Sequence, residues 1–127
     1  MKITTHQFGT IEYAPENVIS FTSGIFGFEH LKHYLLIKIK EEIFYWLTSI
    51  DEPEIVFPLI GVRVIDDKYP EEEKHEAFGI VTLKPDLLKV TVNLKSPVYI
   101  NESTKTGFQK MLDSDKYLIE YNLFKNE

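Results

Sequence analysis

Two histidines, His30 and His33, lie three residues apart and could direct two imidazoles toward one metal ion from a single helical face. A third ligand would have to be Glu29 or a residue remote in the sequence. The chain has no H-E-x-x-H motif and no cysteine that could serve as a thiolate ligand. The spacing is more typical of two solvated histidines on a short helix, so we predict no metal site and no cofactor.

Three consecutive carboxylates, Glu71, Glu72 and Glu73, could be imagined as a general acid and a general base. Acid–base catalysis needs two groups in different environments, whereas neighbours in one polar segment are solvated alike. None of the serines lies in a G-x-S-x-G nucleophile elbow, and the lack of cysteine excludes thiol catalysis. The residues therefore predict a protein that is not an enzyme, with a carboxylate-dependent hydrolase as a weaker alternative.

The composition predicts a single domain over residues 1–127. A 43% apolar share, with nine phenylalanines, seven tyrosines and one tryptophan, is enough to fill one core. The net charge is −6 and the basic residues are scattered, so we predict no direct binding to nucleic acid. An acidic surface instead favours encounter with basic partners. No apolar stretch approaches the roughly 20 residues of a membrane helix, so we expect a cytoplasmic protein without membrane contact.

Short β-prone runs separated by turn residues dominate the chain, and they must position any functional group. Alternating apolar and polar residues are typical of strands, and Gly and Pro mark the turns between them. The runs Tyr34–Lys40 and Ile43–Ile50 are joined by Glu41–Glu42 and predict a hairpin. Only Phe28–Tyr34 and Pro70–His75 are plausible helices. The pattern predicts a mainly β, antiparallel β-barrel-like fold with one or two short helices, and a β-sandwich is the alternative.

Three residues within the strand pattern carry specific predictions. Gly79 is expected to mark a β-bulge or a close approach of two backbones. Pro58 has no N–H to donate to a sheet ladder, so the run Ile55–Ile65 is expected at a sheet edge or with a bulge at Pro58. Trp46, the single tryptophan, lies in an alternating run. We expect it to be buried in a core, with a role as a partner-contact anchor as the alternative.

Two acidic segments, Asp51–Glu54 and Asp66–His75, bracket the strand that Pro58 assigns to an edge. An edge offers unpaired backbone groups to a partner, and carboxylates on both flanks would steer a basic protein toward it. Tyr69 could supply an aromatic contact near the centre. The alternative is that these charges only keep the edge soluble. The candidate partner-binding residues are Asp51, Glu52, Glu54, Asp66, Asp67, Tyr69, Glu71, Glu72 and Glu73.

The stretch ISFTSGIFGFEHLKHY concentrates aromatic residues around two glycines. Gly24 and Gly27 can adopt positive φ, which is typical of a tight corner. We expect this corner to bury Phe26 and Phe28 beneath the barrel, and Glu29 to cap a short helix beyond it. The alternative is that the corner is part of a partner surface.

Three motifs in order along the chain resemble the flagellar assembly factor FliW family. They are GIFGFE at Gly24–Glu29, YWL with a following serine at Tyr45–Ser49, and the stretch Asn93–Asn101, which contains Pro97. Each motif is short, but the three occur at fitting separations and the likeness covers most of the chain. The residues that carry it best are Gly24, Gly27, Phe28, Glu29, Trp46, Asn93 and Pro97.

This resemblance implies a β-barrel-like fold without catalytic activity. It also implies binding to flagellin and antagonism of the RNA-binding translational repressor CsrA, so that flagellin synthesis follows flagellin secretion. The net charge of −6 agrees with a basic RNA-binding partner. A small-ligand-binding β-barrel, in which inward aromatic residues line a pocket instead of filling a core, is the alternative function.

Overall fold

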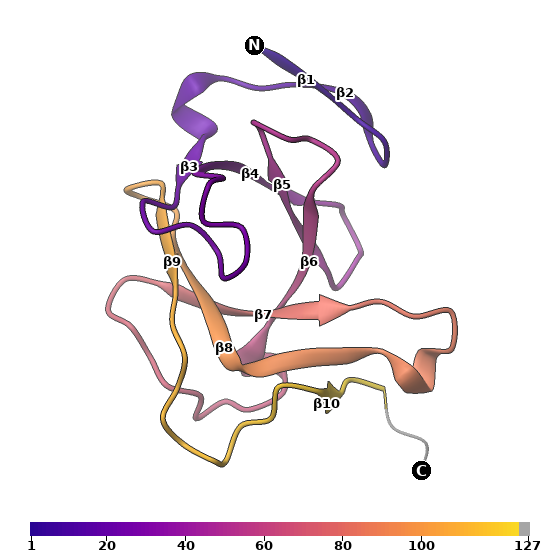
Figure 1. The fold of residues 1–127 in the computed structure, drawn as a ribbon, viewed down its shortest axis with the longest axis vertical. Helices are drawn as coiled ribbons and strands as arrows, with labels where there is room; N and C mark the ends of the chain where they lie inside the picture. The colour runs from indigo at the N-terminus through magenta and orange to yellow at the C-terminus, as the bar shows by residue number, and fades with distance from the viewer. Residues whose placement is uncertain (125–127) are drawn as a thin grey trace.

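Strands β3 to β9 close into a barrel in the computed structural model, which describes residues 1–124 (Figure 1). Consecutive strands of the barrel pair antiparallel. The barrel closes where Ser20 of β3 pairs in parallel with Thr106 of β9. The predicted antiparallel β-barrel-like fold is therefore confirmed. The barrel strands are β3 (Ile19–Ser20), β4 (His33–Lys38), β5 (Tyr45–Ser49), β6 (Val56–Gly61), β7 (Glu76–Thr82), β8 (Thr91–Asn101) and β9 (Thr106–Gln109).

The N-terminal hairpin of β1 (Lys2–Thr5) and β2 (Gly9–Glu12) covers the outer face of the barrel at β5 (Figure 1). The ring of Phe8, in the hairpin turn, lies 6.0 Å from that of Trp46 in an edge-to-face contact. Trp46 is only 9% exposed, and its indole N–H donates to the Glu42 carboxylate at 3.1 Å. The predicted burial of Trp46 is confirmed. The hairpin provides part of this burial, because the barrel interior is filled from the opposite face of β5.

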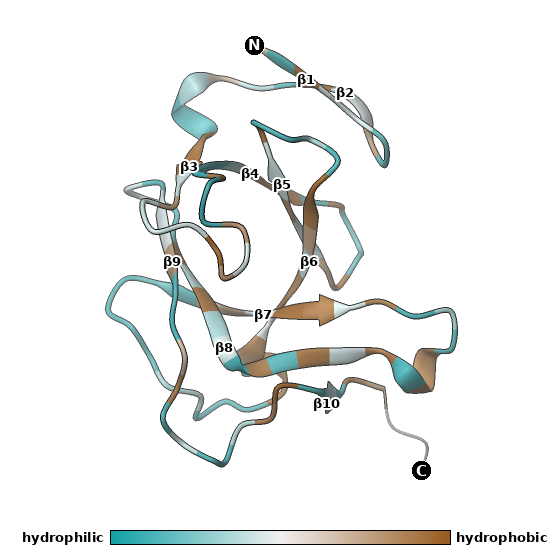
Figure 2. Cartoon of the chain, viewed as in Figure 1, coloured by the Kyte–Doolittle hydropathy of each residue, from teal (hydrophilic) through white to brown (hydrophobic). Residues whose placement is uncertain are grey.

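Two apolar cores stabilise the chain, one inside the barrel and one on its outer wall. Figure 2 shows apolar residues concentrated along the barrel strands and polar residues in the connecting turns. The inner core consists of Ile19, Phe21, Ile25, Leu31, Tyr34, Leu47, Leu59, Phe78, Val98 and Ile100. The outer core lies under the C-terminal segment that includes β10 (Tyr121–Asn122), and consists of Ile60, Val62, Tyr69, Ala77, Val81, Val90, Val92, Leu94, Tyr99, Leu112 and Tyr117.

A β-bulge bends β8 where it leaves the barrel. The register between β7 and β8 shifts between Phe78 and Ile80, at Gly79. A Cβ atom at Gly79 would lie 2.5 Å from Val92 Cγ2, so any larger residue would force Val92 to move. On β8, Asn93 Oδ1 accepts two backbone N–H groups, from the residues two and three positions later, at 3.0 Å each. The predicted bulge is confirmed, and it directs the first part of β8 toward the outer core.

Neither Phe28–Tyr34 nor Pro70–His75 is helical, so both helix predictions are wrong. The first segment forms turns and then enters β4, whose sheet pairing uses its backbone groups. The second is a turn in which the His75 N–H donates to the Glu72 carbonyl at 3.0 Å. Helices this short lack the length to offset the cost of nucleation. The helical turns of the described residues are the 3-10 turns η1 (Pro15–Asn17), η2 (Val62–Val64) and η3 (Leu87–Lys89).

The glycine corner before β4 forms as predicted in its backbone but not in its side chains. Gly24 and Gly27 have φ values of 71° and 87°. Phe28 is half-buried against the inner core, whereas Phe26 at the tip is 46% exposed, so its predicted burial is wrong. The Glu29 carboxylate accepts the N–H of Gly27 at 3.1 Å. Glu29 therefore closes the corner and caps no helix.

The prediction that Pro58 marks a sheet edge or a bulge is wrong, because β6 lies between β5 and β7 and pairs with both without a shift in register. The N–H of Ser49 donates to the carbonyl of Ile55 at 3.0 Å, so Ile55 directs its backbone groups toward β5. Since this direction alternates along a strand, Pro58 directs its nitrogen toward β7. Pairing with β7 begins only at the next residue, where Leu59 opposes Ile80. The missing N–H therefore removes no bond from the sheet.

Tyr34 is fully buried in the inner core, and within residues 1–124 its hydroxyl has no hydrogen-bond partner. Burial, and secondarily the Asp51 charge, raises the pKa of Tyr34 to about 12. We expect Tyr34→Phe to leave the free energy of unfolding unchanged or to raise it by about 1 kcal/mol, because burying an unpaired hydroxyl is costly. Chemical denaturation of both proteins measures this difference. A loss of more than about 1 kcal/mol would mean that the hydroxyl is hydrogen-bonded in solution.

Candidate partner-binding surfaces

The first acidic segment, Asp51–Glu54, lies in the turn between β5 and β6 and faces the two histidines. Asp51 Oδ2 is 3.5 Å from His33 Nδ1, and Glu52 Oε2 is 3.6 Å from His30 Nε2. All four side chains are about half exposed, and each contact becomes an ion pair when its histidine is protonated. Over residues 1–124, no three potential metal-ligating side chains gather at one place.

The second acidic segment, Asp66–His75, connects η2 to β7, and three of its carboxylates meet cations. These ion pairs are exposed or partly exposed, so each contributes little to stability. Asp67 and Glu73 are exposed and form no ion pair with any described residue. The ion pairs join Arg63 to Glu71 at 3.2 Å, Lys110 to Glu72 at 3.3 Å and Lys116 to Asp66 at 3.6 Å.

Asp66 organises its own segment through hydrogen bonds. Its Oδ1 accepts the N–H of Lys68 at 3.0 Å, and its Oδ2 accepts the Tyr117 hydroxyl at 3.1 Å. The Lys68 N–H is the largest cause that lowers the pKa of Asp66, followed by the Tyr117 hydroxyl and the charge of Lys116. Asp66 thus fastens the acidic segment to the C-terminal segment.

Tyr69 is not available as the partner contact predicted from the sequence, because it is only 1% exposed. Its hydroxyl donates to the Leu94 carbonyl, and its ring lies 4.8 Å from that of Tyr117, edge to face. Burial raises the pKa of Tyr69. As the one aromatic residue in a polar segment, Tyr69 anchors that segment to the outer core.

The two acidic segments do not form one surface. One precedes Val56 and the other follows Gly61, so they lie at opposite ends of β6 (Figure 1). Six residues of extended strand separate them by about 20 Å. Any partner that contacts both segments would have to span the length of the barrel wall.

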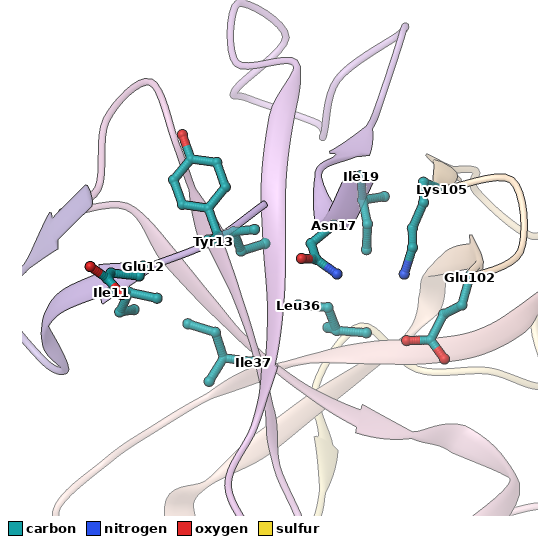
Figure 3. Close-up of a pocket in the computed structure, with 10 residues that line it drawn as sticks. Ile11, Glu12, Tyr13, Asn17, Ile19, Leu36, Ile37, Glu102 and Lys105 are labelled. Carbon is teal, nitrogen blue, oxygen red and sulfur yellow. The ribbon is translucent and has the colours of Figure 1, made fainter. Parts of the chain in front are cut away.

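A groove of about 230 Å³ lies beside β4, between the N-terminal hairpin and the barrel (Figure 3). In Figure 3, Ile11 and Ile37 lie along one part of the groove, and Glu102 and Lys105 reach in from the turn between β8 and β9. The groove therefore combines an apolar part with a charged part. Its lining residues are Ile11, Glu12, Tyr13, Asn17, Ile19, Leu35, Leu36, Ile37, Glu102 and Lys105.

Sequence reasoning missed this groove because barrel closure brings its residues together from separate segments. The one local signal is the turn at Pro15–Asn17, directly before β3, which limits β3 to two residues. A β3 that short covers only part of its neighbour β4. Its length could not be read from the residue pattern, because the run NVISF is β-prone throughout.

None of the helical segments within residues 1–124 has the length and apolar character needed to cross a membrane.

The family model described as FliW protein matches residues 2–72 and 68–123 of the chain. The chain belongs to the FliW family. The resemblance drawn from the order of three motifs is confirmed by this match.

Several FliW relatives align with nearly the whole chain. The flagellar assembly factor FliW of Caldanaerobacter subterraneus subsp. tengcongensis is 38% identical, over 98% of this chain and 94% of its own length. That of Clostridium tetani is 32% identical, over 100% of this chain and 98% of its own length. A crystal structure of the flagellar assembly factor FliW superimposes with a TM-score of 0.87 at 27% identity, covering 98% of each chain. The barrel described above is thus similar to a solved FliW fold.

Proposed function

We propose that this chain is a non-enzymatic, cytoplasmic regulator of flagellar assembly that binds flagellin and antagonises the translational repressor CsrA. The observation that carries the proposal is the match to the FliW family over nearly the whole chain. Flagellin held in the cell would occupy the regulator, and flagellin secretion would release it to inhibit CsrA. Competition between the two complexes, governed by mass action, would then couple flagellin synthesis to secretion.

The filled barrel interior favours a protein partner over a small ligand. Ten buried side chains occupy the inner core. Packing there is tight, since a Cβ atom at Gly107 would lie 2.4 Å from Phe21 Cζ. A small-ligand barrel needs its inward aromatic residues to line a pocket, and here they contact one another. This packing supports recognition through the outer surface.

The acidic segment after η2 is the surface that we propose for steering CsrA. Asp67 and Glu73 are exposed and form no ion pair with a described residue, while Glu71 and Glu72 pair with cations of this chain. Exposed ion pairs are easily exchanged for contacts with a partner. Carboxylates at the rim of an interface act mainly on the rate of encounter with a basic protein.

Replacing Glu71, Glu72 and Glu73 together with lysine is expected to slow the association of CsrA about tenfold at low salt. The salt dependence of the association rate should flatten, and the dissociation rate should change less. Stopped-flow or surface binding kinetics at several salt concentrations measure both rates. Circular dichroism should show an intact fold, because the changed side chains lie outside both cores.

A matched control replaces Asp113, Asp115 and Glu120, which are exposed in the C-terminal segment, with lysine. This control changes the net charge by the same amount at another place. Equal slowing in both triple variants would mean that only total charge matters, and an unaltered association rate in the first would remove the steering role. If the unmodified chain bound neither purified flagellin nor purified CsrA, the proposed function itself would be wrong.

A further inference from the structure

One part of β4 is covered by a neighbouring strand on one side only. Strand β3 pairs with β4 only at His33 and Tyr34, whereas β5 pairs along β4 as far as Lys38. The residues that precede β3 form the η1 turn, Pro15–Asn17, and therefore do not pair with β4. From Leu35 to Lys38, therefore, no strand within residues 1–124 covers the side of β4 opposite β5.

The backbone groups of two residues point toward this uncovered side. The Lys32 carbonyl accepts the N–H of Phe21 at 2.8 Å, on the side where β3 lies. Because the direction alternates along an antiparallel strand, Tyr34, Leu36 and Lys38 point the same way. Tyr34 uses its groups to pair with β3. Those of Leu36 and Lys38 have no strand partner among the described residues, which makes this edge a template for an added strand.

The groove described above runs along this same edge. Leu36 and Ile37 line it from β4, and Ile11 faces Ile37 from β2 (Figure 3). The side chains of an extended strand alternate, so an added strand would direct every second side chain toward this apolar wall. Backbone pairing supplies affinity in such sites, and the groove supplies side-chain preference.

A carboxylate, Glu102, lines the charged part of the groove. A second carboxylate, Glu76 on β7, pairs with Ile100, two residues before Glu102, and burial, followed by the charge of Glu102, raises the pKa of Glu76. Among the described residues neither carboxylate forms an ion pair. Lys105 also lines the groove, while Lys38 lies over the Tyr45 ring, 5.1 Å from its centroid. Two mutually repelling carboxylates without an ion pair favour a basic side chain on whatever binds there.

We propose that the groove beside β4 binds an extended polypeptide segment of a partner protein, which adds a strand at Leu36–Lys38 and places a basic side chain near Glu102. This inference goes beyond the flagellin and CsrA proposal, because it specifies the chemistry of the occupant and not its identity. The overall charge of −6 also favours a basic segment over an acidic one.

A capped synthetic peptide, Val-Arg-Val-Arg-Val-Arg-Val, serves as the probe in an NMR titration of the full chain. We expect the largest amide shift changes along β4, at Leu36 and Lys38. The same peptide with alternate backbone nitrogens methylated keeps its side chains and loses its donors, so it should bind at least tenfold more weakly. A peptide with glutamate in place of arginine should also bind at least tenfold more weakly.

Matched variants separate the backbone of β4 from its side chains. Leu36→Pro removes an N–H that points away from β5, so the β4–β5 pairing is retained, whereas Leu36→Ala removes only side-chain atoms. The proline variant should bind the probe about tenfold more weakly than the alanine variant. If Leu36→Pro fails to fold, Lys38→Pro and Lys38→Ala provide the same comparison. Glu102→Gln should weaken binding about threefold, and Glu120→Gln should not.

Several outcomes would overturn the proposal. They are no binding at millimolar probe, shift changes away from β4, equal binding of the methylated peptide, and equal binding by the proline and alanine variants. Dimerisation of the chain that is lost in the proline variant alone would place a second copy at this edge, which also overturns the assignment of a partner segment. None of these results depends on whether flagellin or CsrA binds.

Discussion

Replacing Trp46 with alanine is expected to lower the free energy of unfolding by about 3–5 kcal/mol, the usual penalty for emptying a buried aromatic site. The indole contacts the rings of Phe8 and Phe44, each 6.0 Å away between centroids. Its loss removes a main contact between the N-terminal hairpin and the barrel, so it opens a cavity and loosens the hairpin. Chemical denaturation followed by circular dichroism measures the change, because the variant has no tryptophan to report by fluorescence.

The matched control is Trp46→Phe, which keeps an aromatic ring but loses the indole N–H that donates to Glu42. It should cost about 1–2 kcal/mol, less than the alanine variant. In the unmodified chain, Trp46 fluorescence should be blue-shifted and poorly quenched. A red-shifted, readily quenched emission, or a cost below about 1 kcal/mol for the alanine variant, would contradict the observed burial.

Replacing Gly24 with alanine is expected to destabilise the fold by about 2–5 kcal/mol, because two costs add. Its φ of 71° lies in the left-handed region, which strains any residue with a Cβ. That Cβ would also lie 2.6 Å from Glu29 Cα and 2.9 Å from the Glu29 carbonyl oxygen. Backbone atoms cannot move aside as a flexible side chain does, so the corner has to open. Denaturant unfolding of the variant measures the loss.

Gly27→Ala separates the two costs. Gly27 has a φ of 87°, but a Cβ there would meet no atom within 4 Å. This variant should cost only about 1–2 kcal/mol, the strain of the left-handed conformation alone. If the two alanine variants were equally destabilised, the contact with Glu29 would contribute nothing.

Local chemistry explains which parts of the fold the sequence alone could predict. The β4–β5 hairpin follows from two alternating runs around Glu41–Glu42, and Glu41 indeed has a positive φ of 72° in the turn. The left-handed glycines follow from a property of glycine that needs no knowledge of distant residues. The size of Trp46 favours its burial, but that burial also depends on the N-terminal hairpin, whose Phe8 covers the indole.

Tertiary pairing decided what the residue pattern could not. Pro58 predicts an edge strand only if the strand on the side of its nitrogen needs an N–H there, and the β6–β7 ladder begins one residue later. Phe28–Tyr34 has the composition of a short helix, but its end pairs with β3 and β5 once the barrel closes. Tyr69 lies in a polar segment, and its burial depends on an outer core that the C-terminal segment completes.

The sequence by itself determined that this is a mainly β protein with an aromatic core, glycine corners and the motif order of the FliW family. These features depend on residue type and on short-range spacing, which the chain carries whatever its fold. Only the tertiary structure buried Tyr69 in the outer core and left the edge of β4 open beside a groove. Both results depend on which strands become neighbours when the barrel closes, and contacts between residues distant in sequence fix that arrangement.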